Sequence, residues 1–469
     1  MLFSGITFLY YFIPCVMIVY FVVPKCFKNA SLLLASIIFY AWGEPKFLVF
    51  MVLSVIQGYI FGLLIEKFRN SKWPKVFLAT SVLFSLGLLG YCKYADFFIE
   101  NINRVTGQNI PLLNIALPIG ISFYTFQIMS YVIDVYKNQA KAQRNYINLA
   151  TYITMFPQLV AGPIVRYTDI EKQLKQREHS FDGVALGIRR FVAGLSKKIL
   201  LANTLGELVD FIKTTENPSL LFFWMYAIAY TLHIYFDFSG YSDMAIGLGK
   251  IFGFHFPENF DYPYISRSIT EFWRRWHISL GSWFRDYVYI PLGGNRVGKT
   301  RWFVNIFIVW MATGFWHGAA WNFILWGVLF AVLLIIEKKW LLEKLKKQKL
   351  WNHLYVLFFV IISFVIFDGE SVEGAFYYLK GMFGFGAVPL ISEEALYYLR
   401  SYGVLLLGGM VFATPGPKIL LQKLTKGKYK EKADKILFFA EPLVMLGALI
   451  ICTAFLVDGS FNPFLYFRF

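Results

Sequence analysis

Three histidines, His233, His277 and His317, lie in or beside apolar or aromatic segments, and the setting of His317 suits acid–base chemistry. His317 stands in the segment G-F-W-H-G-A-A-W-N (314–322), within the apolar stretch 303–336, and His277 follows E-F-W-R-R-W. Burial keeps an imidazole neutral, so one ring nitrogen can accept a proton from a hydroxyl group. A single buried histidine is more often structural, and the residues alone leave both interpretations open.

A polar segment, Y-F-D-F-S-G-Y-S-D (235–243), interrupts an otherwise apolar region. An uncompensated carboxylate at the centre of a membrane span costs roughly 2.5–3.5 kcal/mol, so these side chains should face protein or water. They either brace a broken helix, with a bend at Gly240, or line a polar tunnel. The candidate tunnel residues are Asp237, Ser239, Asp243 and Asn322.

Arginines alternate with tryptophans between residues 273 and 296. This pattern is typical of a helix at the membrane interface, with indoles at headgroup depth and guanidinium groups in water. Guanidinium groups also pair with phosphate in bidentate fashion, as a polyanionic donor such as coenzyme A would require. The candidate donor-binding residues are Arg274, Arg275, Arg285 and Arg296.

The composition identifies the environment of these residues as a membrane. Of 469 residues, 57% are hydrophobic and only 16% charged, too few to cover a soluble protein of this size. The net charge is +16, and the basic residues stand in loops between apolar stretches. We therefore interpret them as residues that set the orientation of the chain in the membrane, rather than as a nucleic-acid-binding surface. The four cysteines form no ligand set, so we expect no metal site.

The chain is predicted to be an all-α membrane protein with roughly ten to twelve spans and re-entrant or interfacial helices around a central funnel. Two apolar pieces, 31–42 and 152–165, are too short or too interrupted for simple spans and are predicted to be re-entrant or interfacial. We expect one membrane domain over residues 1–469, with its catalytic core at about 235–337. The stretches long enough to cross, or nearly so, are 5–23, 47–65, 76–92, 110–135, 220–235, 303–336, 354–367, 397–413 and 436–457.

Charge in the loops predicts orientation. Basic residues dominate 66–75, 337–349 and 415–435, which places these loops in the cytoplasm. Acidic residues dominate 368–395, which fits the outer side. Alternating crossings then leave the N-terminus and the tail 458–469 outside the cytoplasm.

The motifs resemble the membrane-bound O-acyltransferase (MBOAT) family, in its bacterial branch typified by the membrane subunit of alginate O-acetyltransferase. They are F-D-F-S-G-Y-S-D-M-A-I-G, P-Y-I-S-R-S-I-T-E-F-W-R-R-W-H-I-S-L, R-D-Y-V-Y-I-P-L-G-G-N-R and G-F-W-H-G. The resemblance implies that His277 and His317 are the two family histidines and that His317 holds the catalytic position. The alternatives are D-alanyl transfer to teichoic acid, a transporter or flippase without acyl chemistry, and a purely structural assembly subunit.

The expected reaction moves an acetyl group from a cytoplasmic thioester, acetyl-coenzyme A or an acyl-carrier protein, to an extracytoplasmic polysaccharide. No bound cofactor is expected, and a bacterial cytoplasmic membrane is the expected location. The chain has no G-x-S-x-G elbow, so we expect an extracytoplasmic, esterase-like (SGNH-type) transferase as partner, besides membrane lipids and the polymer and without nucleic acid. Tyr466, in the tail F-L-Y-F-R-F, is either an acyl carrier or part of an aromatic anchor.

Overall fold

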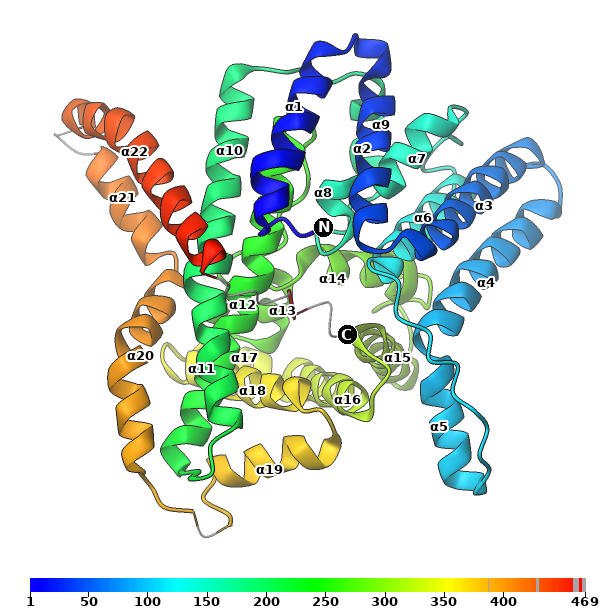
Figure 1. Ribbon diagram of the computed structural model, residues 1–469. Helices are drawn as coiled ribbons and strands as arrows, with labels where there is room; N and C mark the ends of the chain where they lie inside the picture. Colours follow the sequence, from blue (N-terminus) through cyan, green and yellow to red (C-terminus); the bar gives the residue numbers. More distant parts are fainter. Residues whose placement is uncertain (387, 427–429, 459–463, 466–469) are drawn as a thin grey trace. The chain divides into compact units, whose positions relative to one another are not determined.

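The computed structural model describes residues 1–386, 388–426, 430–458 and 464–465, and all regular elements in these ranges are helical (Figure 1). The all-α prediction is therefore confirmed. Seven described helices are long and apolar enough to cross a membrane, and the other apolar stretches form shorter, broken or less apolar helices. The seven are Lys25–Gly43, Pro45–Lys67, Trp73–Lys93, Leu220–Ile251, Trp351–Asp368, Glu393–Phe412 and Ala433–Val457.

The chain divides into two compact units. Unit 1 comprises Met1–Phe191, Met244–Glu258 and Arg285–Tyr287. Unit 2 comprises Val192–Asp243, Asn259–Phe284 and Val288–Phe469, and contains both candidate histidines.

In unit 1, helices α3, α4 and α6 pack on one another, and α2 packs on α7. Gly62 of α3 permits the first contact, because a Cβ there would lie 2.7 Å from the hydroxyl oxygen of Tyr131 on α6. The helices are α1 (Ile13–Val22), α2 (Lys28–Gly43), α3 (Leu48–Lys67), α4 (Trp73–Lys93), α5 (Ala95–Thr106), α6 (Ile121–Tyr136), α7 (Tyr146–Thr154), α8 (Phe156–Leu159), α9 (Tyr167–Lys175) and most of α10 (Phe181–Ser196).

The two pieces predicted to be re-entrant or interfacial behave differently. Residues 31–42 lie inside α2, which is long enough to cross when the 3-10 turn at Lys25 is included, so the prediction of a short piece was wrong there. The start of this candidate span was missed because Lys25 and Lys28 are charged. Lysines at the end of a span are tolerated, because their long side chains can extend to the membrane–water interface. Residues 152–165 are interrupted as expected, between α7 and α8. The freed backbone is satisfied within the protein, since Ser36 accepts a hydrogen bond from the Phe156 N–H at 3.0 Å.

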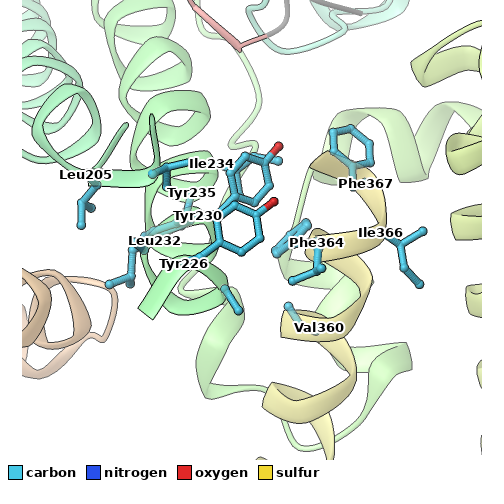
Figure 2. Packing of buried hydrophobic residues seen from close by; sticks show 14 of the residues in the cluster. Leu205, Tyr226, Tyr230, Leu232, Ile234, Tyr235, Val360, Phe364, Ile366 and Phe367 are labelled. Carbon is cyan, nitrogen blue, oxygen red and sulfur yellow. The ribbon is translucent and has the colours of Figure 1, made fainter. Parts of the chain in front are cut away.

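Unit 2 is built around the first part of α12 (Leu220–Ile251) and α18 (Trp351–Asp368). Figure 2 shows Tyr226 and Tyr230 of α12 opposite Val360 and Phe364 of α18 in this core. The remaining helices are α11 (Thr204–Lys213), α13 (Ile269–Arg275), α14 (Ile278–Phe284), α15 (Lys299–His317), α16 (Trp321–Ile336), α17 (Leu342–Lys346), α19 (Val372–Met382), α20 (Glu393–Phe412), α21 (Gly416–Lys426) and α22 (Lys430–Val457).

The polar segment 235–243 does not break a helix. It continues α12 without interruption, which corrects the expected bend at Gly240. Gly240 instead allows close packing, because a Cβ there would lie 2.8 Å from the carbonyl oxygen of Gly194.

The apolar stretch 303–336 forms two helices rather than one. Helix α15 ends at His317 and α16 begins at Trp321, and the two pack along each other. Gly327 allows this contact, because a Cβ there would lie 2.5 Å from the carbonyl oxygen of Trp310. The break places His317 at a helix end, between the two arms of a helical hairpin.

Candidate active site

His317 is enclosed by aromatic rings. Its centroid lies 5.1 Å from those of Trp326 and Phe367, both in edge-to-face geometry, and 5.0 Å from that of Trp316. The side chain is 5% exposed. Such a setting disfavours the charged imidazolium, as a general base requires in its resting state.

His277 lies between α13 and α14 with a φ of 45°, in the left-handed region. It is 1% exposed, and its Nδ1 lies 3.1 Å from Oδ1 of Asn259. That Oδ1 also accepts hydrogen bonds from the N–H of Ser279 at 3.2 Å and from its hydroxyl at 2.9 Å. An atom that accepts a backbone N–H is the amide oxygen, so the contact with His277 is a hydrogen bond when the ring proton is on Nδ1.

The shorter contact, to Asn259, favours the Nδ1–H tautomer of His277 over the tautomer in which the Ser279 hydroxyl, 3.5 Å away, would donate to Nδ1. With the proton on Nδ1, the lone pair is on Nε2. Burial lowers the pKa of His277 to about 3, so the ring is neutral at physiological pH. The structure thus presents a neutral imidazole whose Nε2 accepts hydrogen bonds.

Asn259 is a site residue that the sequence did not reveal. It stands in the loop P-E-N-F between α12 and α13, where nothing distinguishes it from an ordinary turn residue. Its backbone carbonyl also accepts the Ile278 N–H at 3.0 Å, so it holds the His277 segment through both side chain and main chain.

We expect Asn259→Ala to lower acyl transfer about 100-fold, because small losses of alignment at a reacting group have effects of that size. Ser279→Ala is the matched control, since it removes one hydroxyl from the same network and leaves the Asn259–His277 contact. Turnover of a labelled thioester in proteoliposomes measures both. If Asn259→Ala is as active as the unmodified protein, Asn259 does not contribute to acyl transfer.

Unit 2 brings the two histidines together. The Trp316 ring lies 5.9 Å from the His277 ring and 5.0 Å from the His317 ring, so one indole touches both. The two residues come from separate segments, the α13–α14 junction and the end of α15.

The predicted tunnel carboxylates form ion pairs. Asp237 is fully buried and pairs with Lys198, itself 2% exposed. Asp243 pairs with the more accessible Lys197, with 2.7 Å between Nζ and Oδ2. Neither lysine was expected from the sequence, although K-K inside the apolar run 191–203 was a visible signal.

The other two predicted tunnel residues, Ser239 and Asn322, are uncharged side chains of unit 2. Ser239 is buried, and its hydroxyl has no hydrogen-bond partner among the described residues. Asn322 caps the end of α18, donating to the carbonyl oxygens of Gly369 at 2.6 Å and Phe367 at 3.1 Å. Asn322 therefore ties down the end of the helix that carries Phe367, a ring beside His317.

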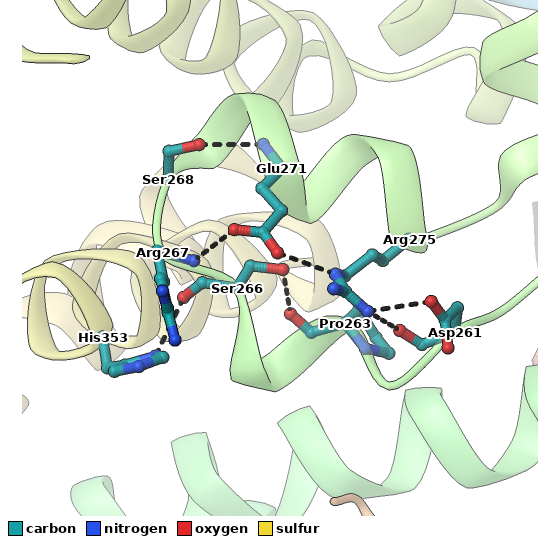
Figure 3. Close-up of polar contacts among 8 residues, drawn as sticks. All are labelled: Asp261, Pro263, Ser266, Arg267, Ser268, Glu271, Arg275 and His353. Carbon is teal, nitrogen blue, oxygen red and sulfur yellow. Dashed lines mark hydrogen bonds and ion pairs between the residues drawn. The ribbon is translucent and has the colours of Figure 1, made fainter. Parts of the chain in front are cut away.

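The four predicted donor-binding arginines separate into two pairs. Arg275 bonds to Asp261 at 2.8 Å and Glu271 at 3.0 Å (Figure 3), and Arg285, in unit 1, bonds to Asp286 at 2.7 Å. Arg274 and Arg296, in unit 2, are exposed and form no ion pair with a described residue. The second pair therefore has guanidinium groups available to an anion.

A buried glutamate holds the helix that carries Arg274. Glu337 is fully buried, and its carboxylate accepts the N–H groups of Ile269 at 2.6 Å and Thr270 at 2.9 Å, at the first turn of α13. The side chain of Ser268 caps the same turn by accepting the Glu271 N–H at 3.0 Å (Figure 3). In the sequence, Glu337 stands at the start of the basic stretch 337–349, where nothing distinguishes it from a solvent-exposed acidic residue.

The described part of the C-terminal tail is buried in unit 2. The Phe464 ring lies 4.8 Å from that of Tyr241 and 5.9 Å from that of Phe238, which in turn lies 4.7 Å from His277. The N–H of Leu465 donates to Oδ2 of Asp237 at 2.9 Å. Tyr466, the carrier candidate, lies outside the described residues.

Residues 121–379 match the model of the membrane-bound O-acyltransferase family, and the chain belongs to this family. It is a membrane O-acyltransferase. Among curated proteins it is 37% identical to "Probable alginate O-acetylase AlgI" of Azotobacter vinelandii, over 100% of both chains. It is 31% identical to "Peptidoglycan O-acetyltransferase" of Helicobacter pylori, over 100% of this chain and 98% of the relative. Identity to "Teichoic acid D-alanyltransferase" of Bacillus subtilis is 30%, over 54% of this chain and 67% of that protein.

Proposed function

We propose that the protein moves an acetyl group from a cytoplasmic thioester to an extracytoplasmic polysaccharide, from a bacterial cytoplasmic membrane with both termini outside the cytoplasm. The observation that carries this proposal is the pair of enclosed histidines in unit 2, one of them fixed as a neutral hydrogen-bond acceptor by Asn259. The relatives aligned over their whole length are named as O-acetylating proteins, which favours acetyl over D-alanyl transfer.

His317 acts as the general base in this proposal. Its imidazole takes the proton of the acceptor hydroxyl while the hydroxyl oxygen attacks the carbonyl carbon of the thioester. The C–S bond then breaks, and the leaving thiolate takes up the proton from His317. His277 accepts a hydrogen bond at Nε2 and orients the hydroxyl. His317 is 5% exposed, and we propose that substrates reach it when neighbouring aromatic rings move.

We propose acetyl-coenzyme A as the donor, with its phosphates bound by Arg274 and Arg296. Lys338 lies within electrostatic reach of Arg274, and burial followed by the positive charge of Arg274 lowers the pKa of its ammonium group. Purified protein in proteoliposomes tests the donor directly. Release of free coenzyme A from acetyl-coenzyme A supports the proposal, whereas turnover only of a D-alanyl carrier protein would replace it.

We also propose that Tyr466 carries the acetyl group to an SGNH-type partner outside the membrane. Support comes from the preceding two residues, because both are buried and the Phe464 ring lies beside Phe238, a neighbour of His277. A carrier on this tail would begin its path close to the site.

Tyr466→Phe tests the carrier. The variant keeps an aromatic ring for anchoring and loses the only hydroxyl on that side chain, so we expect polymer acetylation in cells to fall to background. Mass spectrometry of the C-terminal peptide should show an acetyl group on the unmodified protein and none on the variant. Unchanged polymer acetylation in the variant would eliminate the carrier, and Tyr397→Phe, at an exposed tyrosine of α20, is the control.

A further inference from the structure

Basic side chains, the charged Lys28 and Arg177 among them, gather around Tyr20 in unit 1. Nζ of Lys28 lies 4.3 Å from the centroid of the Tyr20 ring, the guanidinium carbon of Arg177 lies 5.9 Å from it, and the His179 ring lies 5.5 Å from it. Lys25 is close enough to act electrostatically on Lys28 and His179. We call Tyr20, Lys25, Lys28, Arg177 and His179 the Tyr20 cluster.

Hydrogen bonds hold the cluster in a fixed arrangement. The Tyr20 hydroxyl donates to the Phe252 carbonyl at 2.9 Å and accepts from Nε of Arg177 at 3.2 Å. Nε2 of His179 lies 2.8 Å from the same oxygen. Arg177 also stacks over the Phe254 ring, with 4.3 Å from its guanidinium carbon to the centroid. The cluster is thus preorganised rather than a set of flexible surface chains.

The cluster retains unused hydrogen-bond donors. Arg177 uses Nε on Tyr20 and Nη1 on Asn29 and Gln173, so the N–H groups of Nη2 have no hydrogen-bond partner among the described residues. Lys28 uses one of its three N–H groups, on the Tyr20 carbonyl at 3.0 Å. These donors are available to an oxyanion.

No carboxylate neutralises the cluster. Within the described residues, no Asp or Glu oxygen lies within 4.0 Å of a side-chain nitrogen of Lys25, Lys28, Arg177 or His179. Burial, followed by the positive charges of Lys28 and Arg177, lowers the pKa of His179. Like charges gathered without a counter-charge indicate that the counter-charge comes from a ligand.

The surroundings of the cluster are apolar and exposed. Phe21, Val22 and Phe27 lie next to it in the chain and are 40%, 78% and 59% exposed. Nζ of Lys28 lies 5.3 Å from the Phe21 ring. An anion bound at this place would therefore have apolar side chains beside it, as a phospholipid with acyl chains requires and a free phosphate does not.

The predicted topology places the cluster on the same side of the membrane as the other basic loops. Two candidate spans, Lys25–Gly43 and Pro45–Lys67, separate it from the basic residues 68–75, so two crossings return the chain to the same side. Basic loops mark the cytoplasmic side, and basic pockets between helices there bind anionic headgroups.

We propose that the Tyr20 cluster binds the phosphodiester headgroup of an anionic phospholipid, with its acyl chains along Phe21, Val22 and Phe27. Arg177 and Lys28 contact the phosphate oxygens, and Lys25 adds charge at the rim. The site is independent of the acyl-transfer site.

Native mass spectrometry of the full-length protein, titrated with phosphatidylglycerol or phosphatidylcholine, tests the site. The variant Lys25→Gln/Lys28→Gln leaves Arg177 and its hydrogen bonds in place. We expect it to bind phosphatidylglycerol about 30-fold more weakly, because each basic residue near an anionic lipid contributes about fivefold. Lys72→Gln/Lys75→Gln removes the same charge from exposed positions on the same side and should change binding less than about threefold.

Three other results would overturn the proposal. Equal weakening by the two double variants would mean that the lysines act only through general surface charge. Equal affinity for phosphatidylcholine would exclude recognition of anionic lipid. Displacement of the lipid by inorganic phosphate at similar concentration would make the site one for a free phosphate.

Discussion

His317→Ala is expected to reduce acetyl transfer about 100- to 10,000-fold, the range in which a positioned general base contributes. The imidazole is the only proton acceptor that the proposal places at the reacting hydroxyl, and the alanine cannot replace it. The rate of coenzyme A release by purified protein in proteoliposomes measures the loss directly. Acetylated polymer in cells gives an independent reading.

Controls separate loss of chemistry from loss of folding. His317→Gln keeps a polar side chain of similar size and should retain the monodisperse profile and thermal midpoint while losing transfer. His255→Ala removes an exposed histidine and should be active. The double variant His277→Ala/His317→Ala should lose little more than the single one, because residues that act as a unit are not additive. Full activity of His317→Ala in a folded protein would end the assignment.

Asp237→Ala should destabilise the protein by about 3–5 kcal/mol, because it leaves the Lys198 ammonium buried without its counter-charge. The double variant Lys198→Met/Asp237→Leu replaces both charged side chains with apolar ones and should recover most of the lost stability. Unfolding in mixed micelles, followed by tryptophan fluorescence, measures the difference.

Asp243→Ala is the matched control on the same helix. Its partner Lys197 is 31% exposed at the side chain, so water can solvate the remaining charge and the loss should be about 1 kcal/mol or less. Equal destabilisation by the two variants would mean that burial of the Asp237–Lys198 pair does not determine the loss of stability. Normal stability of Asp237→Ala with lost transfer would instead favour the tunnel role predicted from the sequence.

The Asp237 variants also test how the tail is held. Oδ2 of Asp237 accepts the Leu465 N–H, so its loss leaves a buried donor without a partner. Faster cleavage at the C-terminus by carboxypeptidase would accompany Asp237→Ala, and not Asp243→Ala.

The sequence predicted the helical class, the aromatic setting of His277 and His317, and the presence of intramembrane carboxylates. These follow from composition and local pattern, because a polar group in an apolar stretch is visible without a structure. The partners were not predictable. Asn259, Lys198 and Glu337 act on residues distant in the chain, and their local sequences are those of an ordinary loop, a basic dipeptide and a helix end.

Two helix boundaries were wrong for a related reason. One of the two interpretations of the polar segment 235–243 was a broken helix, but Lys197 and Lys198 pair with its carboxylates and α12 continues. The stretch 303–336 was expected to be continuous, yet it breaks at 318–320 so that α15 and α16 pack on each other. In both places contacts between helices override the local pattern.

His277 and His317 are 1% and 5% exposed, and this enclosure bears on how much acyl donor is lost to hydrolysis. Water is the most abundant competing nucleophile, and a site that keeps it out prevents hydrolysis of a reactive acyl compound. An acyltransferase built in this way would not hydrolyse its thioester donor when no acceptor polymer is present. The donor would then remain available to other reactions of the cell.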